Sequence, residues 1–130
     1  MIDKIDIPIY STSVVLLIEI TEKELKDFYK DNKNLMTYEE YKSIKEDMKA
    51  ENIKGATMTC DSGNYLIYLK NGKSDNFVSH EIFHVCNRIL LNKGVHIDED
   101  AEPWAYLIGW FTDEYYRRYW KQAEEKQKKK

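Results

Sequence analysis

Apolar and polar residues alternate with two different periods along the chain, and this pattern predicts both strands and helices. Isoleucines alternate with polar residues or proline over residues 5–9, which predicts a short edge strand. Residues 14–20 are more continuously apolar and fit a buried strand or, by pattern alone, the core of a helix. Residues 56–60 and 65–69 are also strand-like, and the Asp-Ser-Gly-Asn sequence between them favours a hairpin.

Two capping boxes mark helix starts in the first half of the chain. Thr21 and Thr37 are each followed three residues later by a glutamate, so each pair of side chains can satisfy two free amides of a first turn. These boxes predict helices over residues 21–30 and 37–51. The residues expected to face inward on these helices are Leu25, Phe28 and Tyr29, and then Tyr38, Tyr41, Ile44 and Met48.

Two further helices are predicted in the second half of the chain. Ser74 or Asp75 can cap a helix that runs to about residue 92, and Gly94 is expected to stop it. An acidic turn at residues 98–100 then leads into a last helix over about residues 101–121.

The order of these elements predicts an α+β fold in a single domain over residues 1–123, followed by a charged, flexible tail at 124–130. The net charge of −3 gives no reason to expect nucleic-acid binding, which usually needs a basic face. No apolar run is long enough to cross a membrane and no leader is visible, which predicts a cytoplasmic protein. Cys60 and Cys86 are too few for a disulfide framework and are expected to be reduced core residues.

The most informative motif lies within the third predicted helix and reads His80-Glu81-Ile82-Phe83-His84. Two histidines four residues apart share one helix face, so they can present two imidazoles to one zinc ion beside Glu81. Such a motif also arises by chance as a solvated polar stripe on a surface helix. Its flanks favour the metal, because a charged triplet inside an apolar helix needs a partner. The apolar flanking residues are Phe77, Val78, Ile82, Phe83, Val85, Ile89 and Leu90.

Zinc bound by two histidines needs a third protein ligand and an open position for water. The downstream candidates are His96, Asp98, Glu99, Asp100 and Glu102. Glu102 is preferred because it stands 18 positions after His84, which lets the next helix come alongside the first. Glu99 and Asp98 remain alternatives, and His96 is expected in a surface turn. The other interpretation of Glu102 is an acidic residue that interacts favourably with the helix dipole.

The two motifs together resemble those of the gluzincin metallopeptidases, with His80-Glu81-Ile82-Phe83-His84 followed by Glu102-Pro103-Trp104-Ala105-Tyr106. The smallest relatives are the minigluzincins and the ImmA/IrrE-type peptidases of mobile elements. The latter have a Glu-x-x-Ala-Asn pattern, which is similar to Glu102-x-x-Ala105-Tyr106 here. The chain also looks like small phage-encoded proteins in which the second motif continues Ala-Tyr-x-x-Gly. The resemblance covers about residues 65–110.

This resemblance implies a small zincin-like domain with a short mixed sheet, a hairpin or edge strand, a motif-bearing helix and a C-terminal helix that carries a glutamate. It implies that His80, His84 and Glu102 hold Zn²⁺ and that Glu81 is the general base in peptide-bond hydrolysis. It further implies that a protein or peptide substrate pairs in extended form with the strand at residues 65–69, taken as an edge strand.

One feature of the second motif leaves a non-catalytic role open. Tyr106 stands where larger relatives have an acidic or amide group, although its hydroxyl can still orient an imidazole. The competing function is a phage or mobile-element structural, assembly or host-interaction protein with a structural zinc site.

The last predicted helix is rich in aromatic residues, most of them expected in the core. An exposed patch at Tyr116, Tyr119 and Trp120 would form a partner or homodimer surface.

Overall fold

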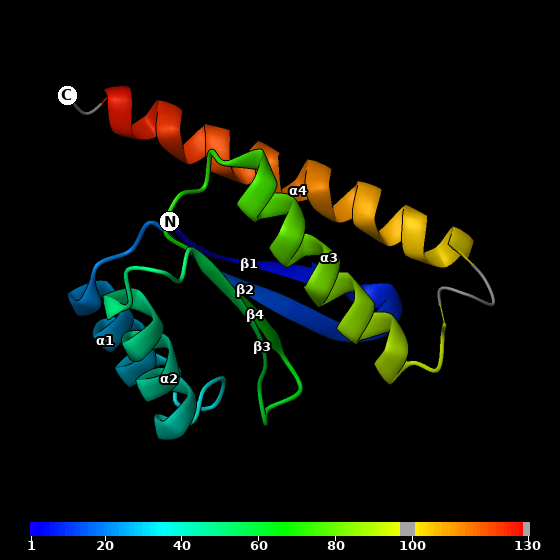
Figure 1. Ribbon diagram of the computed structural model, residues 1–130, viewed down its shortest axis with the longest axis horizontal. Helices are drawn as coiled ribbons and strands as arrows, with labels where there is room; N and C mark the ends of the chain where they lie inside the picture. Colours follow the sequence, from blue (N-terminus) through cyan, green and yellow to red (C-terminus); the bar gives the residue numbers. More distant parts are fainter. Residues whose placement is uncertain (97–100, 129–130) are drawn as a thin grey trace.

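A computed structural model of the chain describes residues 1–96 and 101–128. Over these residues the chain forms a mixed sheet and four α-helices, which confirms the expected combination of helices and strands (Figure 1). The strands are β1 (Ile2–Ile7), β2 (Thr12–Ile18), β3 (Gly55–Thr59) and β4 (Tyr65–Leu69). The helices are α1 (Glu22–Asp31), α2 (Tyr38–Lys49), α3 (Asp75–Asn92) and α4 (Ala101–Lys128), with a short 3₁₀ turn, η1 (Pro8–Tyr10), after β1.

The four strands are ordered β1-β2-β4-β3 in one sheet. The central pair, β2 and β4, is parallel, and each outer strand is antiparallel to its neighbour. β1 is therefore an edge strand, as predicted for residues 5–9. The prediction that residues 65–69 form an edge strand is wrong, because β4 pairs on both sides and β3 is the second edge. All five residues of β4 are buried, as expected of a strand covered on both faces.

Helices cover both faces of the sheet, so the domain has three layers (Figure 1). α1 and α2 lie on one face, where the buried residues include Val15, Leu17, Leu25, Ile44, Leu66 and Tyr68. α3 and α4 lie on the other face, where the larger cluster includes Ile5, Leu16, Ile67, Val85, Ile89, Phe111 and Tyr115. Alternate residues of β2 and β4 thus point into different cores. No helix in the described parts of the chain is long and apolar enough to cross a membrane.

Both predicted capping boxes are present. The Thr21 hydroxyl accepts from the Glu24 amide at 3.1 Å, and the Glu24 carboxylate accepts from the Thr21 amide at 3.1 Å. The backbone amide of Thr21 holds the pKa of Glu24 below its usual value. Thr37 and Glu40 make the same reciprocal pair at 3.1 and 2.8 Å. One inward residue was wrongly predicted, since Tyr38 is exposed in the first turn of α2.

The third and fourth helices begin close to their predicted positions. Ser74 is the N-cap residue of α3, and Gly94 follows the helix with a φ of 78°, a backbone conformation that favours glycine. α4 continues past residue 121 to Lys128, so residues 124–128 are helical where a flexible tail was expected. The acidic turn at residues 98–100 lies outside the described residues.

A polar cluster joins the ends of β2 and β4 to α4. The Glu19 carboxylate accepts from the Gly72 amide at 2.9 Å and from the Tyr119 hydroxyl at 2.8 Å. The Tyr115 hydroxyl donates to the Gly72 carbonyl at 3.0 Å. A Cβ atom at Gly72 would lie 2.5 Å from the Tyr119 ring and 2.6 Å from Ile18, so only glycine fits there. The close contact of Gly72 with Tyr115 and Tyr119 fixes the start of α3 relative to α4.

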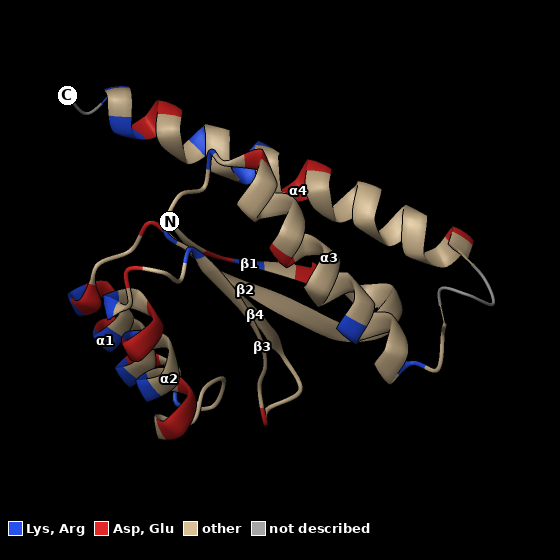
Figure 2. Ribbon diagram, viewed as in Figure 1, with Lys and Arg blue, Asp and Glu red and all other residues tan. Residues whose placement is uncertain are grey.

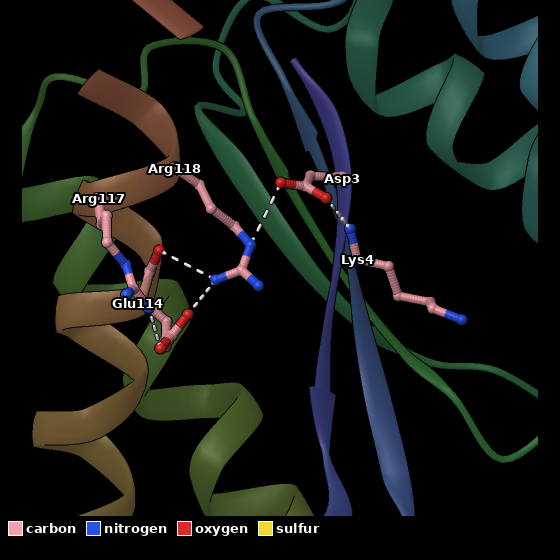
Figure 3. A network of polar contacts seen from close by, with 5 residues as sticks. All are labelled: Asp3, Lys4, Glu114, Arg117 and Arg118. Carbon is pink, nitrogen blue, oxygen red and sulfur yellow. Dashed lines mark hydrogen bonds and ion pairs between the residues drawn. The ribbon is translucent and has the colours of Figure 1, made fainter. Parts of the chain in front are cut away.

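An ion-pair network ties α4 to the β1 edge of the sheet (Figure 3). Arg118 Nε lies 3.2 Å from Asp3 Oδ2, and the other end of its guanidinium pairs with Glu114 one turn earlier in the helix. Arg117 pairs with the same glutamate. These arginines hold the pKa of Glu114 below its usual value. α4 is therefore held against β1 by charge as well as by its apolar face.

Candidate functional site

α3 brings the two motif histidines together on its surface. His80 Nε2 and His84 Nε2 lie 3.1 Å apart, although the His80 side chain is 66% exposed. Two nitrogen ligands at zinc-bonding distance from one tetrahedral ion lie ~3.3 Å apart. The imidazole pair therefore fits two positions of a zinc site with little adjustment.

Glu81 points the other way, into the protein, and has its own partner there. Its side chain is only 7% exposed. The Thr57 hydroxyl of β3 lies 3.0 Å from Glu81 Oε2 and 3.2 Å from the Glu81 carbonyl oxygen, and it donates its hydrogen to this pair of acceptors. The other carboxylate oxygen, Oε1, lies 3.9 Å from His80 Nε2. One oxygen of Glu81 is thus held by β3, and the other lies on the side of His80.

The burial of the three motif residues differs from what the apolar flanks of the helix predict. We expected the whole triplet to lie inside an apolar helix and to need a metal as its partner. Instead His80 is exposed, and the buried Glu81 obtains its hydrogen bond from Thr57. A buried carboxylate needs such a partner, so the helix flanks alone do not require a metal. The convergence of the imidazoles is the observation that supports one.

A glycine allows β3 to approach Glu81 closely. A Cβ atom at Gly55 would lie 3.2 Å from Glu81 Cγ, 2.9 Å from Leu69 Cδ2 and 3.0 Å from the Tyr68 carbonyl oxygen. Beside this contact is a cavity of about 340 Å³, lined by His80 and Glu81 together with Asn52, Ile53, Lys54, Gly55, Asn76 and Phe77. The motif therefore borders an open cavity between α3 and the start of β3.

A third side chain of α3 reaches the outer edge of β3. Arg88 Nη1 donates to the Thr57 carbonyl at 3.1 Å and to the Thr59 hydroxyl at 3.4 Å. His80, His84 and Arg88 are spaced by four residues and so lie along one stripe of the helix. Thr57 consequently joins two parts of the site, with its hydroxyl on Glu81 and its carbonyl on Arg88.

Glu102, the predicted third ligand, lies exposed in the first turn of α4. Two residues further on, Trp104 packs edge-on against Phe83 with ring centroids 5.0 Å apart, and Phe83 in turn contacts His84. Among residues 1–96 and 101–128 no group of three His, Cys, Asp or Glu side chains is placed to hold a metal ion. The structure therefore brings the start of α4 near the histidines, and the role of Glu102 stays a prediction. The alternatives Asp98, Glu99 and Asp100 lie outside the described residues.

The remaining residues discussed from the sequence are His96, the two cysteines and Tyr106. His96 is exposed, as expected of a surface residue. Cys60 and Cys86 are free and buried, and burial raises the pKa of each thiol to about 12, so both behave as core residues. Tyr106 is 75% exposed and lines a groove beside η1, so its role in orienting an imidazole stays a prediction.

The exposed aromatic residues of α4 differ from those predicted. Tyr119 is buried and Tyr116 is partly buried, so of the predicted patch only Trp120 is exposed. Tyr106 and Trp110 are exposed instead, near the exposed Ile9 of η1. This half of α4 carries no charged residue between Glu102 and Asp113 (Figure 2).

Thr57 and Arg88 were both missed by the sequence analysis. Arg88 continues the four-residue spacing of the histidines, and that periodicity was a usable signal. Thr57 carries no such signal, because its contact with Glu81 depends on which strand borders the helix. In comparisons with known proteins, no family model, no curated protein and no solved structure matches the chain.

Proposed function

We propose that the protein is a zinc-dependent metallopeptidase of the gluzincin type. The observation that supports this best is the 3.1 Å approach of two imidazole nitrogens beside a carboxylate that a second element holds in position. In this proposal His80 and His84 hold the ion, and Glu102 is the third ligand from α4. When bound, zinc supplies Lewis-acid activation of water and of the scissile carbonyl.

Glu81 is the general base in this proposal. Its Oε2 accepts the Thr57 hydrogen bond, which leaves Oε1 toward the histidines to take a proton from the attacking water. The same carboxyl group then gives the proton to the leaving amine. Because Thr57 restrains the carboxylate, the base is already oriented before substrate binds.

The substrate in this proposal is a peptide in extended form along β3. Within the β3–β4 ladder, Lys54 and Cys60 bond toward β4, so even-numbered residues of β3 face that strand. Gly55, Thr57 and Thr59 therefore direct their backbone groups to the edge beside His80 and Glu81, where the Thr57 carbonyl also accepts from Arg88. A peptide that pairs with these groups lies across the motif. β3 thus replaces residues 65–69 as the proposed substrate strand.

Metal content and hydrolysis test the proposal separately. Protein purified without chelator is expected to contain about one zinc per chain by mass spectrometry, and His84→Ala is expected to lose it. Glu81→Gln is expected to keep the zinc and to lose peptide hydrolysis by about 10²–10⁴-fold. Glu39→Gln, an exposed change on α2, is the matched control and should retain both. Metal-free wild-type protein, or full hydrolysis by Glu81→Gln, contradicts the proposal.

Assembly is a second candidate function, favoured by the uncharged surface at the start of α4. A groove of about 680 Å³ lies there, lined by residues of η1 and α4. Ile9 and Tyr106 are exposed in its lining, and residues 7–12 and 103–112 contain no charged side chain. A surface patch that meets its own copy about a two-fold axis is buried against itself, and the burial of this patch desolvates no charge. We propose a second copy of this chain as the occupant.

Oligomeric state tests this second candidate. Light scattering across a range of protein concentrations is expected to show a dimer that Trp110→Glu converts to monomer. Trp120→Glu changes an equally exposed tryptophan of the same helix outside the patch, and it should leave the dimer intact. A wild-type protein that stays monomeric at all concentrations contradicts assembly through this surface.

A further inference from the structure

Arg88 places a positive charge at the open edge of β3, on the same stripe of α3 as the two histidines. It stands one helical turn beyond His84, ~6 Å along the helix axis. Its guanidinium reaches past the helix to the Thr57 carbonyl and the Thr59 hydroxyl. A peptide lying along β3 therefore passes this cation.

Much of the binding capacity of this guanidinium is unused. Arginine has five N–H donors, and both contacts of Arg88 are made by one nitrogen, Nη1. The other arginines of the described chain, Arg117 and Arg118, each pair with a carboxylate, whereas Arg88 has no ion pair among residues 1–96 and 101–128. An exposed arginine that has no ion pair within the described residues, next to a proposed substrate strand, is suited to bidentate recognition of a carboxylate.

We propose that Arg88 is a specificity-determining residue that binds a carboxylate of the peptide substrate. The inference rests on the proposed function, because it assumes that a peptide lies along β3. Glu81 and Arg88 are ~10 Å apart along the axis of α3. An extended peptide covers this distance in ~3 residues. The carboxylate therefore belongs to a residue within about three positions of the bond attacked, on the Thr59 side of the site.

Two chemical sources can supply such a carboxylate, namely an Asp or Glu side chain or the free C-terminus of a short peptide. Four peptides of otherwise identical sequence separate them. One pair carries Glu or Gln at the third position from the expected cleavage site, with the C-terminus amidated in both. The other pair has no acidic side chain and ends in either a free carboxylate or an amide.

Binding is measured by fluorescence anisotropy with labelled peptides and the zinc-loaded Glu81→Gln protein, which binds without cleaving. One carboxylate peptide is expected to bind about tenfold or more tightly than its amide partner. Adding Arg88→Gln is expected to remove this preference while amide peptides bind within about twofold of before. Arg88→Lys keeps the charge and should retain part of the preference. Arg117→Gln, which removes a surface arginine far along α4, should retain all of it.

The failures of the two proposals are distinguishable. Wild-type protein that holds zinc and cleaves peptides with no carboxylate preference overturns the role of Arg88 alone. A carboxylate preference that depends on Arg88, in a protein without zinc or hydrolysis, overturns the peptidase proposal alone. Equal preference with and without Arg88, or no binding by any of the four peptides, overturns the inference. A merely structural Arg88 would alter thermal stability without changing the ratio between paired peptides.

Discussion

The two edges of the sheet are stabilised in different ways. β1 inserts Ile5 and Ile7 into the core, and its Asp3 pairs with Arg118 of α4. β3 has no fully buried residue, and its polar contacts with α3 include hydrogen bonds from Thr57 to Glu81 and from Arg88 to Thr57 and Thr59. Both edges carry polar groups that need protection from unwanted pairing. β1 meets this need with core packing and ion pairs, whereas β3 leaves backbone groups open beside the histidines.

The two edges therefore divide stability and chemistry between them, with β1 serving the core and β3 serving the candidate site. Changes at β1 act mainly on the free energy of unfolding. β1 is at the opposite edge of the sheet from β3, the strand that contacts Glu81. Changes at β3 act on the orientation of Glu81 as well. The following substitutions test that separation.

The largest effect is expected from Ile5→Ala in β1. Ile5 is fully buried against α3 and α4, so its truncation is expected to lower the free energy of unfolding by ~2–5 kcal/mol in urea titrations. Zinc content per folded chain should not change. Leu91→Ala removes the same number of carbon atoms from an exposed position near the end of α3 and should stay within ~0.5 kcal/mol of wild type. Equal losses for both variants would contradict the assignment of the core.

Thr57→Val in β3 is expected to have a smaller effect on stability and a larger one on the site. The buried Glu81 carboxylate loses its hydroxyl donor, which costs ~1–3 kcal/mol. Hydrolysis should also fall, because the carboxylate is no longer restrained. Thr57→Ser keeps the hydroxyl and is expected to retain most of both properties. A Val variant as stable and as active as the Ser variant would show that this hydrogen bond does not matter.

Asp3→Asn tests the ionic part of the β1 edge. The half-exposed pair with Arg118 is expected to contribute ~0.2–1 kcal/mol at low salt, measured by thermal unfolding, and less at high salt. Asp6→Asn is the matched control on the same strand, where a more exposed pair with Lys4 spans 3.7 Å. The network is unimportant for stability if the two variants behave alike.

A pH dependence of stability is expected at α4. Burial, together with the hydrogen bond to Glu19, raises the pKa of Tyr119 to about 12 from 10.0. Between about pH 10 and 12 the folded protein keeps this proton while the unfolded chain loses it, so the free energy of unfolding falls as pH rises. Tyr119→Phe should make this fall shallower, as followed by urea titrations at several pH values. An unchanged slope would contradict the shift.

Local signals in the sequence predicted most of the elements. The capping boxes at Thr21 and Thr37 formed as expected, because each needs only residues within one turn. The hairpin of β3 and β4 and the start of α3 also follow from adjacent turn residues. Such features depend on neighbours in the chain, so one sequence is enough to find them.

Features that depend on distant pairing were predicted less well. The strand at residues 65–69 was taken as an edge, although its unbroken apolar sequence is typical of a central strand. The exposure of Tyr106 and Trp110 depends on how α4 crosses the sheet, which the aromatic content of the helix does not reveal. The convergence of His80 and His84 was predictable from helix geometry, whereas the Thr57–Glu81 contact needed the strand order.

The candidate site is also compact along the sequence. Thr57 and Glu81 are 24 positions apart and Thr57 and Arg88 are 31 apart, whereas the Tyr119–Glu19 bond that docks α4 spans 100 positions. Closing a shorter loop costs less chain entropy, so contacts of low separation tend to form first during folding. We therefore expect the hairpin and α3 to assemble early, with Thr57, Glu81 and the two histidines in place before α4 brings Glu102. A chain still emerging from the ribosome would then hold the proposed base and both imidazoles but would lack the third zinc ligand until α4 is made.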